Sequence, residues 1–121
     1  MCNRDQTLKL KLLQEWKFGC VFCGYNKRSP NGNSLLEAAH IQKYSDNSAN
    51  DSINNLILLC PNHHTEYDAG IIDFDVNGII YCIDKNDELN GKHVHKYPDN
   101  VSSGNIKYHN HKLFIGSKSI K

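Results

Sequence analysis

Two pairs of metal-binding side chains, far apart in the chain, constrain the fold of this sequence more than any other feature. Cys20 and Cys23 are separated by two residues, and so are Cys60 and His63. Such pairs let two short turns each present neighbouring ligands to one tetrahedral Zn²⁺, whose preferred donors are thiolate and imidazole. The segment between the pairs, residues 24–59, is far longer than the roughly 12 residues of a simple zinc finger. A folded segment must therefore lie between the two halves of the site.

Two other interpretations of these residues stay open. The cysteines could be buried structural thiols beside a surface histidine, or Cys20 and Cys23 could be a redox-active pair. No thioredoxin-like strand–helix–strand pattern surrounds this pair, which counts against redox chemistry. The five cysteines are odd in number, and cytoplasmic chains rarely keep disulfides. We therefore favour a metal site.

Length and composition indicate one domain with a thin core. The chain has 121 residues and a mean hydropathy of -0.59, and a domain of this size buries only about two thirds of its unfolded surface. A structural metal would offset this deficit. We expect a single domain over residues 1–121, with its core at about 18–70, a hairpin at about 71–84 and a C-terminal extension at 85–121.

Charge and hydropathy exclude some classes of partner. Fourteen basic and thirteen acidic residues give a formal charge of +1, so bulk charge does not indicate a polyanion partner, although a local basic face remains compatible with it. The longest apolar run, residues 56–60, is far shorter than the roughly 20 residues of a membrane span. No apolar signal stretch follows Met1. We expect a cytoplasmic protein without a membrane partner.

Local sequence patterns predict an α+β fold. Apolar residues at helical spacing predict a helix over residues 4–17. Apolar runs predict short strands over 35–41 and 55–59, and proline in a first helical turn predicts a helix over 61–69 that glycine ends.

A hairpin follows. Asn77-Gly78 between two β-rich runs predicts a hairpin over residues 71–83 with a type I′ turn. Beyond residue 84 the patterns weaken: residues 91–98 fit a loop or an edge strand, and residues 108–115 fit a helix or a strand.

A second group of polar side chains falls on these predicted elements. His64 and Asp68 stand four residues apart on the predicted helix and therefore share one face. An imidazole and a carboxylate can hold one divalent ion together and leave positions for water and phosphate. His40 on the facing strand could accept a proton from a water that attacks phosphorus. This pattern favours metal-assisted phosphodiester hydrolysis.

Three stretches of the sequence resemble the HNH endonuclease family. They are LEAAHI at residues 36–41, NLILLCPNHH at 55–64 and YDAG at 67–70. The resemblance covers residues 4 to about 84 and is strongest to the restriction-type branch that carries zinc knuckles. It implies an α+β fold, with a small zinc-braced ββα-metal core, an N-terminal helix and a following β-hairpin.

The resemblance also implies a role for each matching residue. His40 corresponds to the general base and His64 to the metal-ligand histidine. Asn55 corresponds to the central asparagine, whose amide braces the loop so that His40 points correctly. Asp68 falls where related nucleases place a second ligand of the catalytic ion, and Glu37 matches an acidic position near the active site.

The zinc knuckles of the family match Cys20, Cys23, Cys60 and His63, where His63 replaces a more usual cysteine. The residue before the general base departs from the pattern, because many members carry Asp or His there and this chain has Ala39. The catalytic ion would then be Mg²⁺ or Mn²⁺, with water and phosphate completing its coordination shell.

Taken together, the resemblance implies a metal-dependent endonuclease that hydrolyses phosphodiester bonds in double-stranded DNA, in restriction or phage defence. Cutting both strands would require a homodimer or two successive nicks. Lys27, Arg28 and Lys43 flank the predicted site on loops and are candidate phosphate contacts. A catalytically inactive, zinc-stabilised DNA-binding module is the main alternative, favoured by Ala39 and by the weak net charge, and a purely structural zinc protein is the third.

Overall fold

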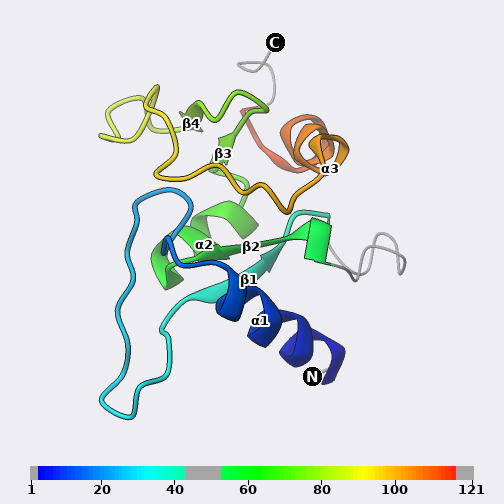
Figure 1. The fold of residues 1–121 in the computed structure, drawn as a ribbon. Coiled ribbons are helices and arrows are strands. Elements are labelled where there is room, and N and C mark those ends of the chain that lie inside the picture. Colours follow the sequence, from blue (N-terminus) through cyan, green and yellow to red (C-terminus); the bar gives the residue numbers. More distant parts are fainter. Residues whose placement is uncertain (1–2, 43–52, 117–121) are drawn as a thin grey trace.

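The computed structural model describes residues 3–42 and 53–116. Its elements follow in the order α1 (Asn3–Glu15), β1 (Glu37–His40), the 3₁₀ turn η3 (Ile53–Asn55), β2 (Leu56–Leu59), α2 (Pro61–Asp68), β3 (Ile72–Phe74), β4 (Ile80–Cys82), α3 (Ser103–Tyr108) and the π-helical turn η4 (His109–Leu113). The α+β prediction is confirmed. Figure 1 shows α1 at one end of the molecule, the β3–β4 hairpin and α3 at the other, and the β1–β2–α2 unit between them.

The central unit is an antiparallel strand pair with a helix packed against it. In the β1–β2 register, Glu37 lies opposite Leu59 and His40 lies opposite Leu56. All four residues of β2 are buried, and α2 contacts both strands. The continuous apolar run of β2 fits a strand that is covered on both faces.

Helix α2 begins and ends where the sequence predicts. Cys60 caps its N-terminus, because the thiol sulfur accepts a hydrogen bond from the backbone N–H of His63, and Pro61 occupies the first turn. Gly70 follows the helix with a φ of +77°, and a side chain there would meet the carbonyl oxygen of Leu113 at 2.5 Å. Glycine is therefore required at this position both by the backbone conformation and by the close approach of the C-terminal segment.

The hairpin is present, but the predicted type I′ turn is wrong. That turn needs a positive φ at both central residues, and among the described residues no non-glycine has one. Instead, the N–H of Gly78 bonds to the carbonyl of Asp75, and the Asp75 carboxylate accepts hydrogen bonds from the N–H groups of Asn77 and Ile79. The carboxylate stabilises a type I turn, and Gly78, at φ +81°, supplies the left-handed residue that rejoins the strands.

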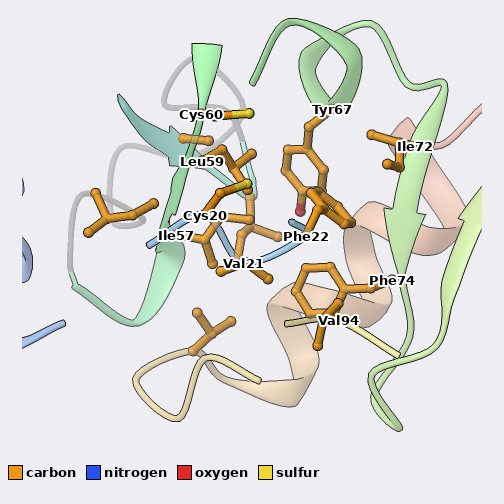
Figure 2. Close-up of a cluster of buried hydrophobic side chains, with 14 of the residues drawn as sticks. Cys20, Val21, Phe22, Ile57, Leu59, Cys60, Tyr67, Ile72, Phe74 and Val94 are labelled. Carbon is orange, nitrogen blue, oxygen red and sulfur yellow. The ribbon is translucent and has the colours of Figure 1, made fainter. Parts of the chain in front are cut away.

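One apolar core joins the cysteine knuckle, α2 and the β3–β4 hairpin. Phe22, which lies between Cys20 and Cys23, packs against Tyr67 of α2 and Phe74 of β3, with ring centroids 6.1 and 5.7 Å away. Figure 2 shows these rings together, beside the side chains of Cys20 and Cys60. The core therefore connects the cysteine knuckle to α2 and to the hairpin.

The segment after residue 84 combines an edge pairing with a short helix. Residue His93 bridges to Ile79, and Lys92 accepts a hydrogen bond from Ile80, so residues 91–94 lie along the hairpin. Ser102 then caps α3 by accepting from the N–H of Asn105. Within the described parts of the chain, no helix is long and apolar enough to cross a membrane.

Candidate active site

The two distant pairs converge on one point. One ligand atom from each of Cys20, Cys23, Cys60 and His63 lies within 4.8 Å of the others. The sulfurs of Cys23 and Cys60 are 3.9 Å apart, and Nδ1 of His63 is 3.6 Å from the Cys20 sulfur and 3.3 Å from the Cys60 sulfur. With Zn–S near 2.3 Å and Zn–N near 2.0 Å, tetrahedral ligands are roughly 3.5–3.8 Å apart. The group could therefore hold zinc.

The chemistry of the thiols fits a bound cation. Burial raises the pKa of the Cys20 thiol to about 12, and burial also raises the pKa of Cys60. The charge of a neighbouring thiolate adds to these shifts: Cys23 and Cys60 raise the pKa of Cys20, and Cys23 raises the pKa of Cys60. A cation at the centre would stabilise the thiolate forms of Cys20 and Cys60 at neutral pH.

Local structure explains why these side chains meet. In the first knuckle, Gly24 donates its N–H to the carbonyl of Cys20 at 2.8 Å and adopts a φ of +80°. Val21 donates to the carbonyl of Leu58 at 3.1 Å, which ties the knuckle to β2. The second pair stands at the start of α2, directly after β2. Strand β2 therefore holds the two cysteine and histidine pairs close together.

A second polar cluster lies on the adjoining face of α2. Nδ1 of His64 is 2.6 Å from a carboxylate oxygen of Glu37 in β1, and Nε2 is 3.2 Å from a carboxylate oxygen of Asp68. The hydrogen bond to Asp68 raises the pKa of the His64 imidazole, burial partly opposes this, and Glu37 raises it further. The side chains of Glu37 and Asp68 are 46% and 47% exposed, so ions and water reach this cluster.

Asn55 clamps the chain that follows His40. The Asn55 side chain is fully buried. Its Oδ1 accepts from the backbone N–H of Gln42 at 2.8 Å, and its Nδ2 donates to the Gln42 carbonyl at 2.8 Å. Asn55 ends η3 instead of beginning the predicted strand, and β2 starts at Leu56. His40, the last residue of β1, is half-buried and lies two residues before this clamp.

The predicted phosphate contacts are only partly described. Lys27 and Arg28 are exposed, and Lys43 lies outside the described residues. Arg28 lines a groove of about 520 Å³ together with Lys9 and Lys17 of the α1 region. Among the described residues that line this groove, none carries a carboxylate. Sequence reasoning missed this association, because Lys17 lies beyond the end of α1 at Glu15 and Arg28 stands on a separate segment, so no helical spacing connects the three cations.

Sequence reasoning also missed a buried polar cluster beneath α2. The Asp73 carboxylate, on β3, lies 2.8 Å from Nδ1 of His109 and accepts from Nδ2 of Asn110 at 2.8 Å. The ring of Tyr67 stacks on the His109 ring at 3.9 Å between centroids. These bonds fix the C-terminal segment to the hairpin and to α2.

Residues 20–75 match a family model described as HNH endonuclease. A solved structure described as "Modification dependent TagI restriction endonuclease" is similar, with a TM-score of 0.67 and 26% sequence identity over 88% of this chain and 39% of that chain. The present chain thus spans about two fifths of the length of that protein. No curated protein matches the sequence.

Proposed function

Because this chain belongs to the HNH endonuclease family, we propose that it is a metal-dependent enzyme that hydrolyses phosphodiester bonds in double-stranded DNA. The observation that carries the proposal is the cluster of Glu37, His64 and Asp68, in which two half-exposed carboxylates flank one imidazole at the junction of β1 and α2. Such a cluster, open to solvent, suits a hydrolytic ion and a phosphate better than a structural role.

In this proposal the four-ligand group is a structural zinc site. Cys20, Cys23, Cys60 and His63 would hold Zn²⁺ and thereby fasten the first knuckle to the N-terminus of α2. His64 directly follows the ligand His63, so the zinc site sets the orientation of the helix turn that carries the active-site imidazole.

His64 and Asp68 would hold the catalytic Mg²⁺ or Mn²⁺, through Nε2 and a carboxylate oxygen. When bound, this ion supplies positive charge that stabilises the transition state and the departing oxygen. Glu37 would accept the Nδ1–H of His64 and so favour the tautomer whose Nε2, 3.2 Å from Asp68, could bind the ion in place of a proton. Ala39 offers no ligand, and the carboxylate that reaches α2 from this strand belongs to Glu37 two residues earlier.

His40 would act as the general base. Its neutral imidazole accepts a proton from water as the water oxygen attacks phosphorus, and the bond between phosphorus and the 3′ oxygen breaks. The products carry a 5′ phosphate and a 3′ hydroxyl. Asn55 supports this step by holding the backbone of Gln42, so that the end of β1 stays fixed.

A restriction role in phage defence is part of the proposal. It is supported by the description of the similar solved structure as a restriction endonuclease. Double-strand cleavage would then use a homodimer or two successive nicks, and gel filtration together with the time course of nicked and linear plasmid would separate these routes.

The test is a cleavage assay on unmodified and methylated plasmid with Mg²⁺ or Mn²⁺. Wild-type protein should convert supercoiled plasmid to nicked or linear forms, and His40→Ala should not. Intact plasmid with the wild type, on both substrates and with both ions, would reject the enzyme. Retained DNA binding in that case would support the inactive zinc-stabilised DNA-binding module, which Ala39 favours.

A further inference from the structure

The C-terminal segment reaches back to the turn that carries Asn55. Nδ2 of Asn100 donates to the carbonyl oxygens of Ile53 and Leu56, at 2.7 and 2.9 Å. Nδ2 of Asn105, on α3, donates to the carbonyl oxygen of Asn54 at 2.9 Å. Two carbonyls of the turn and one of β2 are thus held by two asparagines that lie outside the segment matched by the family model, residues 20–75.

Asn105 also reaches the other side of the proposed active site. Its Oδ1 accepts from Nε2 of Gln42 at 2.9 Å, while the backbone of Gln42 is held by Asn55. The Asn105 side chain therefore bridges Gln42, two residues after the end of β1, and the turn that precedes β2. It is 9% exposed, so these bonds form in a largely dry environment.

Only a carboxamide can make both bonds at position 105. The side-chain nitrogen donates to a carbonyl and the side-chain oxygen accepts from an amide, whereas a carboxylate has no donor and an aliphatic group has neither. Buried carbonyls that lose their partner destabilise their surroundings locally, because water does not replace the lost bond.

The helix that carries Asn105 is itself fixed. The segment that follows α3 is anchored by the buried bonds of His109 and Asn110 to Asp73 and by the stacking of His109 on Tyr67. The position of Asn105 is therefore fixed relative to α2 and the hairpin. Through its bond to the Asn54 carbonyl, Asn105 in turn holds the turn that carries Asn55.

We propose that Asn100 and Asn105 are positioning residues of the nuclease, which hold the end of β1 and the Asn55 turn in the arrangement that aims His40. The inference rests on the proposed function and assigns a role to the C-terminal segment. It requires that loss of these bonds slow the chemical step more than it weakens DNA binding.

The test compares Asn105→Asp with Ile106→Val, a control on the same helix that disturbs the core but not these bonds. Single-turnover cleavage at saturating DNA gives the rate constant, binding in Ca²⁺ gives Kd, and zinc content and Tm report the fold. Asn105→Asp should lower the rate constant about 10- to 100-fold, with Kd within about twofold and stoichiometric zinc. Ile106→Val should cleave at the wild-type rate at temperatures below its Tm.

A second variant guards against misfolding of the first. Gln42→Ala removes the donor to Oδ1 of Asn105 but keeps the bond of Nδ2 to the Asn54 carbonyl, and it should slow cleavage about fivefold, the equivalent of one hydrogen bond. Wild-type rate constants in folded Asn105→Asp, or in Gln42→Ala should the first variant not fold, would overturn the inference. An inactive wild type in the same assay would reject the proposed function and the inference together.

Discussion

The bond between Glu37 and His64 makes a quantitative prediction for the catalytic ion. Glu37→Gln keeps the size of the side chain and an oxygen acceptor, but it replaces a charged acceptor at 2.6 Å from Nδ1 with a neutral one. A hydrogen bond to a charged group contributes about 1 kcal/mol more than a neutral bond. The Glu37 carboxylate is 46% exposed, so solvent screens part of its charge, and we expect the substitution to cost no more than about 1 kcal/mol.

This loss should weaken Mn²⁺ binding at the active site about fivefold, since 1.4 kcal/mol corresponds to a factor of ten. Isothermal titration of zinc-loaded protein with Mn²⁺ measures the Kd directly, with His64→Ala as the background. Glu88→Gln removes an exposed carboxylate far along the chain and should leave the Kd unchanged.

Cleavage should then recover toward the wild-type rate when Mn²⁺ is raised in proportion to the weakened Kd. If Glu37→Gln binds Mn²⁺ as tightly as the wild type and cleaves at the same rate, Glu37 does not orient His64, and the role assigned to it here is wrong.

The other predictions concern the zinc site, the base and the groove. Cys20→Ala should lose zinc and unfold, because a structural zinc contributes about 10–16 kcal/mol, as much as a small domain's entire stability; metal analysis and circular dichroism check this, and an unchanged Tm would contradict it. His40→Ala should keep the wild-type Tm but lose at least about 100-fold in cleavage rate, whereas a misfolded variant would indicate a core histidine. Replacing Arg28, Lys9 or Lys17 by Ala should weaken binding equally on unrelated DNA sequences and lower the slope of log K against log salt by about 0.9 per lost phosphate contact; an unchanged slope would exclude the groove.

The convergence of Cys20, Cys23, Cys60 and His63 was predictable because short-range rules position each pair. A C-x2-C turn that ends in Gly24, and a Cys60-Pro61 start of a helix, each fix two ligands locally. The apolar run between Asn55 and Cys60 could only be a buried strand or a buried helix segment, and its length favoured a strand. One antiparallel pairing then suffices to bring the two pairs together.

The type of hairpin turn and the supports of the C-terminal segment were not predictable in the same way. The Asn77-Gly78 signal favours a type I′ turn. Instead, the Asp75 carboxylate accepts hydrogen bonds from the N–H groups of Asn77 and Ile79, which stabilises the other turn type. Asn100 and Asn105 act through bonds to carbonyls about fifty residues away. Nothing in their local spacing distinguishes them from the other asparagines of a chain rich in this residue.

The part played by Glu37 lies between these cases. Side chains alternate along a strand, so positions 37 and 39 share a face. Because Ala39 cannot bind a metal, the Glu37 carboxylate is the nearest acidic group on that face. Strand geometry alone could therefore have suggested that Glu37 faces α2. The pairing with His64, however, depends on how the helix packs against β1, which no local pattern specifies.

Helix α2 explains how the candidate zinc group and the proposed site of the catalytic ion can be adjacent without sharing a ligand. Consecutive residues of an α-helix point about 100° apart, so His63 turns toward the cysteine knuckle while His64 turns toward Glu37 on β1. Asp68 returns to the face of His64 one turn later. A zinc ion bound there would hold the first turn of the helix rigidly. Because His64 directly follows His63, the imidazole of His64 would be held in place as well. The role that we assign to zinc in catalysis is therefore one of orientation, and the catalytic ion is left to the solvent-exposed face.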